Sequence, residues 1–186
     1  MWRTQMRKIF LDTETTGISA KDGHRIIEIA AIEELKETTK RNYFHSYVNP
    51  EREIDSYAEA VHGISDDYVK DKPLFSEIIE DFIRFIYGAE VFIHNSPFDE
   101  SFINNELKLM GFNKTMDSFC KVTDTLRIAR KLHPKKSNSL DALCARYSVD
   151  DSARTVHGAL IDAEILARVY SKMKPSTLRQ VEPISH

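Results

Sequence analysis

The stretch KIFLDTETTG, residues 8–17, joins a strand pattern to two acidic residues. Lys8–Asp12 is a short apolar run bounded by Thr and Gly, which is typical of a buried β-strand. Asp12 and Glu14 lie at its carboxyl end, two residues apart. Because side chains alternate between the two faces of a strand, we expect both carboxylates on one face. This spacing alone fits a solvated strand end before a turn equally well.

The segments around this strand predict a mixed α/β fold. Residues 25–35, 43–48 and 90–94 have strand patterns, and residues 36–41 fit a hairpin turn. Helices are expected over residues 73–87, 96–111, 123–132, 139–147 and about 158–173, with one short helix near 58–61 in the loop-like stretch 50–67. Ser96 and Pro97 fit the N-cap and first position of their helix. The order of elements indicates an antiparallel meander followed by parallel strands, with ligands at the carboxyl ends of the strands.

Length and composition predict one domain, residues 1–173, followed by a frayed tail, residues 174–186. No stretch approaches the ~20 apolar residues of a membrane span, and no export signal is recognised, so a cytoplasmic location is expected. Cys120 and Cys144 form no C-x-x-C pair, which argues against a thiolate zinc site.

The net charge is −3, whereas proteins that bind long DNA are usually basic. Any nucleic-acid contact is therefore expected to be short, or to be assisted by cations or a partner.

Three more residues complete a candidate site. Asp99 lies in the first turn of its predicted helix, where Ser96-x-x-Asp99 also fits a capping box; capping and a site role are compatible. His157 precedes Asp162 by five residues, about one and a half helical turns (roughly 500°), so the two do not stack in a regular helix. They converge if His157 lies in the loop before the helix, and Gly158 makes that turn easy. Each motif alone is weak.

The joint pattern predicts metal-dependent chemistry. Two unit charges ~4 Å apart repel by about 4 kcal/mol at an effective dielectric near 20, so converging carboxylates take up protons or bind cations. Oxygen-only ligands select hard ions such as Mg²⁺ or Mn²⁺. A pair of these ions can clamp both reacting oxygens during phosphodiester cleavage. A neutral His beside them can take a proton from the attacking water.

In this order, Asp12-x-Glu14, Asp99 in HNSPFD (94–99) and His157-x4-Asp162 resemble the three-motif signature of the DEDDh 3′→5′ exonucleases. A narrower resemblance follows from VHGI (61–64), FCKVTDTL (119–126) and NSLDALC (138–144). These segments resemble one branch, the proofreading epsilon subunits of bacterial DNA polymerase III. The similarity runs from about residue 8 to residue 173.

The resemblance implies a ribonuclease-H-like fold with a mixed five-stranded sheet flanked by helices. It implies release of mispaired 3′-terminal nucleotides of DNA as 5′-mononucleotides. Two Mg²⁺ or Mn²⁺ ions would be held by Asp12, Glu14, Asp99 and Asp162, with His157 as the general base. The slot for the 3′-terminal nucleotide would be lined by Thr15, Thr16, Val61, His62, Asn95 and Phe98. Glu53 and Tyr57 are added from position alone, because their identities depart from the family pattern.

Partners are implied as well: a frayed or single-stranded 3′ end of DNA, the polymerase III catalytic subunit and a small accessory subunit. The tether to the polymerase is not recognised in residues 174–186, which puts that contact in doubt. A basic stretch comprises Lys121, Arg127, Arg130, Lys131, Lys135 and Lys136. It either tracks phosphates or is a solvated helix face, and the second interpretation is the simpler one.

Three alternatives stay open from the sequence. An RNA-trimming DEDDh enzyme, such as an oligoribonuclease, would use the same chemistry, but residues 119–126 and 138–144 argue against it. A haloacid-dehalogenase-type phosphatase shares the strand-end motif, yet it requires a second Asp where Glu14 stands and leaves His157 without a role. A non-catalytic partner module would have no need of all five residues.

Overall fold

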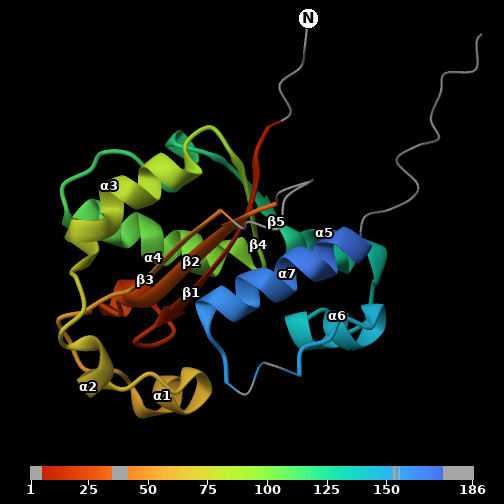
Figure 1. The fold of residues 1–186 in the computed structure, drawn as a ribbon, viewed down its shortest axis with the longest axis horizontal. Coiled ribbons are helices and arrows are strands. Elements are labelled where there is room, and N and C mark those ends of the chain that lie inside the picture. Colours follow the sequence, from red (N-terminus) through yellow and green to blue (C-terminus); the bar gives the residue numbers. More distant parts are fainter. Residues whose placement is uncertain (1–5, 35–41, 153, 155, 174–186) are drawn as a thin grey trace, which may run out of the picture.

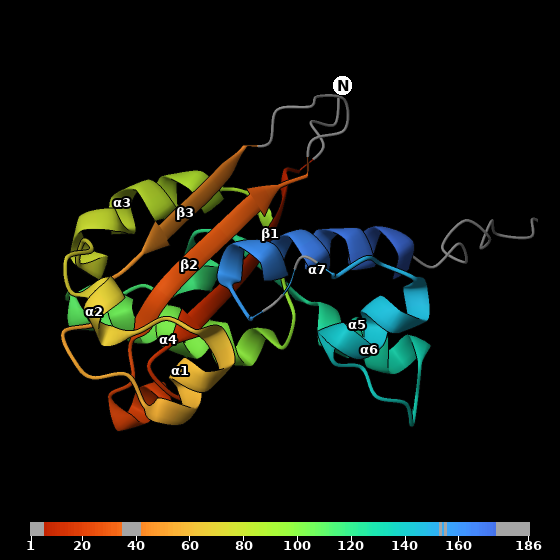
Figure 2. The same cartoon turned by 60° about the horizontal axis from the view of Figure 1, so that its bottom comes forward.

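A computed structural model describes residues 6–34, 42–152, 154 and 156–173. Its centre is a five-stranded sheet in the order β3-β2-β1-β4-β5, seen from two sides in Figures 1 and 2. The strands are β1 (Lys8–Thr15), β2 (Ile26–Glu33), β3 (Tyr43–Tyr47), β4 (Glu90–Ile93) and β5 (Lys121–Asp124). β2 pairs antiparallel with β1 and with β3, whereas β4 pairs parallel with β1 and with β5. This arrangement confirms the predicted meander with parallel additions.

The helices are α1 (Ser56–His62), α2 (Asp66–Val69), α3 (Phe75–Ile86), α4 (Ser96–Leu109), α5 (Thr125–Leu132), α6 (Leu140–Tyr147) and α7 (Ala159–Met173). Two short 3₁₀ helices, Ala20–Asp22 and Met116–Ser118, are added to these. None of the described helices is long and apolar enough to cross a membrane. The predicted hairpin turn at residues 36–41 and the predicted tail at 174–186 lie outside the described residues.

The two faces of the sheet are covered by different helices, as Figures 1 and 2 show. On β1, Ile9 and Leu11 join the core that includes α3 and α4. Phe10 points the other way and packs with Phe92 of β4 and Leu166 of α7. Because of this alternation, Asp12 and Glu14 share the face of Phe10, the face that α7 covers.

Several predicted boundaries are wrong for local reasons. Residues 121–124 form the edge strand β5, although residue 123 was predicted to begin a helix. One exposed and three half-buried residues are too few to show a strand period. The loop-like stretch 50–67 contains one whole helix, α1, and the start of a second, α2. The N-cap of α4 is Asn95 rather than Ser96, and Asn95 has the left-handed conformation (φ 71°, ψ 52°).

The start of α7 is fixed from outside the helix. Glu28 of β2 is buried, and its Oε2 accepts a hydrogen bond from the backbone N–H of Ala159 at 3.0 Å. Its other oxygen lies 2.8 Å from Nε2 of His45. A carboxylate at a helix N-terminus satisfies a free N–H and complements the helix dipole. Glu28 therefore holds the end of α7 that carries Asp162 against the sheet.

Candidate active site

Asp99 reaches the site from the helix that follows β4. β1 and β4 run parallel, so α4, which follows β4, begins at the end of the sheet where β1 also ends. The Asp99 side chain is buried, and its Oδ1 accepts a hydrogen bond from Oγ1 of Thr13 at 2.7 Å. The predicted capping box with Ser96 is therefore not formed, because Ser96 is not the N-cap and the carboxylate is bonded to β1.

His157 and Asp162 converge as the loop hypothesis requires. His157 precedes α7, and its backbone N–H donates to the carbonyl oxygen of Val61 at 3.3 Å. Its Nδ1 lies 3.1 Å from Oδ2 of Asp162. Ligand atoms of Glu14, His157 and Asp162 all lie within 4.8 Å of one another. The loop geometry brings together two residues that a regular helix would separate.

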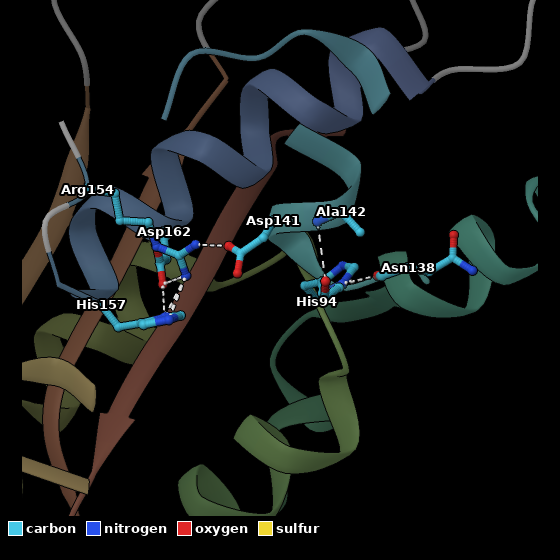
Figure 3. A network of polar contacts seen from close by, with 8 residues as sticks. His94, Asn138, Asp141, Ala142, Arg154, His157 and Asp162 are labelled. Atoms are coloured by element: carbon cyan, nitrogen blue, oxygen red, sulfur yellow. Dashed lines mark hydrogen bonds and ion pairs between the residues drawn. The ribbon is translucent and has the colours of Figure 1, made fainter. Parts of the chain in front are cut away.

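Arg154 joins this group, as Figure 3 shows. Its Nε lies 2.6 Å from Oδ1 of Asp162, and its Nη2 lies 2.8 Å from Oδ2. The same Nη2 is 2.5 Å from Nδ1 of His157, and Nη1 bonds Asp141 on α6. The guanidinium group thus links the loop, α7 and α6 around one carboxylate.

Burial and mutual repulsion raise the pKa values of the carboxylates. Burial, then repulsion from Asp99 and Glu14, raises the pKa of Asp12 well above its ordinary value. Burial, then repulsion from Asp162, raises the pKa of Glu14 to about 8, and burial raises that of Asp99 to about 7. Burial also raises the pKa of Asp162, although the charge of Arg154 opposes the shift. The ionised form of each group is therefore destabilised, and a bound cation would stabilise it.

The donor set fits hard divalent ions. Four carboxylates supply only oxygen, and neither Cys belongs to the cluster of ligand atoms among the described residues. Oδ1 of Asp162 lies 2.6 Å from Nε of Arg154, so this carboxylate already contacts a cation. A ligand oxygen of Asp162 also lies within 4.8 Å of ligand atoms of Glu14 and His157, close enough for a metal ion to be shared among them.

We expect the metal-free protein to lose stability as the pH rises. The folded state holds the protons of Glu14 and Asp99 up to about pH 8 and 7, whereas the unfolded chain releases them near pH 4. The free energy of unfolding therefore falls between about pH 4 and 8. In EDTA, the Tm should drop by about 5 °C or more from pH 5.5 to 8.5.

Addition of Mn²⁺ should restore more of the Tm at pH 8.5 than at pH 5.5, because the cation replaces the protons. Differential scanning fluorimetry over a pH series measures both effects. A metal-free Tm that rises with pH over this range would contradict the clustered arrangement.

We expect Arg154→Gln to lower activity by about 10–100-fold, the usual effect of losing a group that orients a metal ligand. Without the guanidinium charge, the pKa of Asp162 rises further, so the loss should be largest at low pH and partly recovered at high pH. The measurement is kcat against pH, with Mn²⁺ binding by calorimetry. The control is Arg168→Gln, whose guanidinium bonds only the backbone of Asp150 among described residues. Mn²⁺ affinity that is equal or higher in Arg154→Gln would contradict this role.

Two of the predicted slot residues, Val61 and His62, lie close to these groups. Val61 is half-exposed, and its carbonyl oxygen accepts the hydrogen bond from the backbone N–H of His157. The buried ring of His62 accepts from the N–H of Ile64 at Nδ1, so its proton is on Nε2, which has no hydrogen-bond partner in the described structure. Burial lowers the pKa of His62, and the nearby backbone of Thr15 opposes this shift. His62 is therefore a neutral donor beside the end of β1.

The other predicted slot residues differ in exposure and in whether their polar groups have hydrogen-bond partners. The buried Oγ1 of Thr15 donates to the carbonyl of Gly17, and that of Thr16 bonds the N–H of Arg25 and lies 3.0 Å from His24, so both hydroxyls have partners inside the protein. Asn95 is exposed, and Phe98 is half-buried with its ring 5.0 Å from that of Phe102. Tyr57 is exposed and its hydroxyl accepts from the N–H of Ile18; the Glu53 side chain is exposed.

Sequence analysis missed Arg154 and Glu28. Arg154 is the only Lys or Arg between residues 151 and 162, and a cluster of carboxylates calls for a nearby cation, so a signal was present. Glu28 gave none, because its partner at Ala159 is 131 residues away in the chain. Long-range caps of this kind leave no local pattern.

Comparisons with known proteins show the family of the chain. The family described as exonuclease (RNase_T) matches residues 9–170. The chain is 51% identical over 171 residues to DNA polymerase III subunit epsilon of Pasteurella multocida, covering 90% of this chain and 68% of that protein. It is 51% identical over 173 residues to the subunit of the same name of Escherichia coli K12, covering 90% and 71%.

Solved structures share the fold at lower identity. The nuclease domain of 3′hExo, described as a DEDDh family member bound to rAMP, superimposes with a TM-score of 0.75 at 20% identity, covering 91% of this chain and 92% of that one. Exonuclease X in complex with 5′ overhanging duplex DNA gives a TM-score of 0.68 at 24% identity, covering 93% and 94%. Both likenesses confirm the ribonuclease-H-like sheet.

Proposed function

The chain belongs to the exonuclease family, and within it to the DNA polymerase III epsilon subunits; from this premise we propose how its site works. The enzyme is a 3′→5′ exonuclease, a hydrolase that acts in proofreading. We propose that it removes mispaired 3′-terminal nucleotides of DNA and releases them as 5′-mononucleotides. The phosphatase alternative is set aside, because the family match spans residues 9–170.

One observation carries the mechanism: Asp12, Glu14, Asp99 and Asp162 repel one another within one cluster, with His157 at its rim. Asp99 and Asp162 are buried, and Asp12 and Glu14 are half-buried. Such a cluster would hold two Mg²⁺ or Mn²⁺ ions, as its all-oxygen donor set suggests. When bound, two divalent cations neutralise the scissile phosphate and stabilise the attacking and leaving oxygens. The protein's own contribution is to fix the four carboxylates on rigid elements: β1, α4 and α7.

His157 is suited to the role of general base. With its proton on Nδ1, the ring donates to Oδ2 of Asp162, 3.1 Å away. Nε2, which lies 3.4 Å from Nη2 of Arg154, can then accept a proton from the attacking water. Nη2 of Arg154 competes for the same Nδ1. The balance between Asp162 and Arg154 therefore sets which ring nitrogen carries the proton.

The 3′-terminal nucleotide would enter beside His62. Its Nε2–H lies near the backbone of Thr15 and can donate to the nucleotide, and the half-buried ring of Phe98 offers a stacking face. Asn95 and Val61 would border the slot, with the backbone of Thr15 and Thr16 at its floor and Tyr57 and Glu53 at its outer edge. A paired end cannot reach a slot for one or two unpaired nucleotides, so fraying selects mismatches.

The remaining assignments rest on the family. We propose residues 1–173 as the exonuclease domain, acting in the cytoplasm with the polymerase III catalytic subunit and a small accessory subunit. The relatives' name supports the polymerase association. Co-purification with each subunit tests these partners directly.

The test of function is a primer labelled at its 5′ end, incubated with Mn²⁺. The proposal expects a ladder that shortens from the 3′ side, faster for single-stranded or mispaired ends than for paired ends. A matching RNA primer tests the RNA-trimming alternative, and faster trimming of RNA would favour it. Absence of metal-dependent nucleotide release would reject the enzyme assignment.

A further inference from the structure

We propose that a basic cavity between α5, α6 and the end of β4 binds the backbone phosphates of the DNA strand whose 3′ terminus occupies the active site. The inference rests on the proposed function and adds a second binding site to it. The cavity has a volume of about 770 Å³. Its polar lining includes His94, Asn95, Arg130, His133, Lys135 and Lys136.

The charge of this region is opposite to that of the whole chain. Residues 121–136 contain six Lys or Arg and one acid, Asp124, for a net charge of +5, whereas the chain carries −3. No acidic residue is among the described residues that line the cavity. The rest of the chain is net acidic, so the phosphates upstream of the scissile one are drawn toward this cavity.

The cations of the cavity are available for a ligand. Within the described part of the chain, Arg130, Lys135 and Lys136 form neither an ion pair nor a side-chain hydrogen bond, whereas Lys121 pairs with Glu90 at 2.9 Å. Unpaired basic side chains gathered around one hollow are the usual footprint of phosphate contacts. The solvated-face interpretation does not account for the hollow that these side chains share.

The loop that carries the two lysines is held in one shape. Nδ2 of Asn138 donates to the carbonyl oxygens of His133 and Lys136, at 3.1 and 2.9 Å. Its Oδ1 accepts from Nη1 of Arg146 at 3.2 Å. Lys135 has a left-handed backbone (φ 65°), a conformation that persists when its surroundings fix it. A fixed loop lowers the entropy cost of binding a strand.

The cavity shares one residue, Asn95, with the predicted nucleotide slot. His94 ends the β4 region, and its Nε2 donates to the carbonyl oxygen of Asn138 at 2.9 Å, as Figure 3 shows. The next residue, Asn95, lines the cavity and precedes Asp99 by four positions. One hydrogen bond therefore ties the phosphate-binding loop to the segment that leads into the active site. The nucleotides just upstream of the scissile bond would lie in the cavity.

The test compares two substrates on the full chain: a single-stranded DNA of about 20 nucleotides, and the 4-nitrophenyl ester of thymidine 5′-phosphate, which has no nucleotide upstream of the bond that is cleaved. The variant is the triple replacement Arg130→Ala, Lys135→Ala and Lys136→Ala. We expect kcat/KM for the DNA to fall about 10–100-fold at ~0.1 M salt, and that for the ester to stay within about twofold. The slope of log kcat/KM against log salt should become shallower by about 2, since each phosphate contact to a single strand contributes about 0.7.

The matched control is Arg127→Ala with Lys131→Ala, two cations of the same helix that line a different cavity together with Glu100, Asp117 and Asp124. Its DNA activity should stay within about threefold of the parent. The milder pair Lys135→Gln and Lys136→Gln should flatten the salt slope by about 1.4. The proposal is overturned if the triple variant behaves like the control, or if both substrates lose activity equally. Failure of the proposed function looks different, because the unaltered protein would then hydrolyse neither substrate.

Discussion

Asp12→Asn is expected to lower kcat by about 10³-fold or more in Mg²⁺ or Mn²⁺. The change keeps the shape of the side chain and removes one charged oxygen ligand from the centre of the cluster. Loss of several kcal/mol of charge stabilisation in the transition state corresponds to this factor, at about 1.4 kcal/mol for each tenfold. Single-turnover rates with saturating metal measure it on the 5′-labelled primer.

The same variant should be as stable as the parent, or more stable, when metal is absent. Asp12 is repelled by Asp99, Glu14 and Asp162, so removing its charge relieves strain in the metal-free cluster. Thermal unfolding in EDTA therefore separates a loss of chemistry from a loss of fold. Glu80→Gln, at an exposed position of α3, is the matched control and should change neither property. A turnover within tenfold of the parent would remove Asp12 from the site.

His157→Ala is expected to lower kcat by about 10²–10⁴-fold, the usual contribution of a general base. The four carboxylates remain, so Mn²⁺ affinity should change only a few-fold. The rate of the variant should keep rising with pH, since hydroxide from solution replaces the missing base. Assays quenched at fixed times over about pH 6–9 measure the dependence of kcat on pH.

Val156→Ala is the control for this prediction, because Val156 precedes His157 in the same loop and its side chain is half-exposed. Its rate should stay within about threefold of the parent. Near-normal turnover of His157→Ala with saturating metal would reject the base assignment. A variant that loses Mn²⁺ binding altogether would instead make His157 a metal ligand.

The sequence predicted the parts of the fold that have strong periods. The apolar run before Asp12 and the amphipathic α3 were recognisable because burial repeats every two or about 3.6 residues. The edge strand β5 was not, since its four residues pair only with β4 and carry no period. The cap of α4 was misassigned to Ser96, because Asn95 takes a left-handed conformation that a sequence pattern does not reveal.

For the site, too, local patterns were predictable from the sequence and contacts between distant residues were not. Asp12 and Glu14 could be placed on one face from spacing alone, whereas the convergence with Asp99 and Asp162 came from the resemblance and stays a prediction. Thr16 shows the limit of a carried-over role, because its hydroxyl is bonded to the N–H of Arg25 inside the protein. Arg154 and Glu28 position the site through contacts between elements distant in the chain, and such contacts arise only on folding.

The central hypothesis is that the carboxylate cluster holds a pair of divalent cations. Anomalous diffraction at the manganese edge, from crystals soaked with Mn²⁺ and thymidine 5′-monophosphate, measures this directly. Two anomalous peaks beside the carboxylates of Asp12, Glu14, Asp99 and Asp162 are the predicted result. Mn²⁺ bound elsewhere with the cluster still protonated would contradict it.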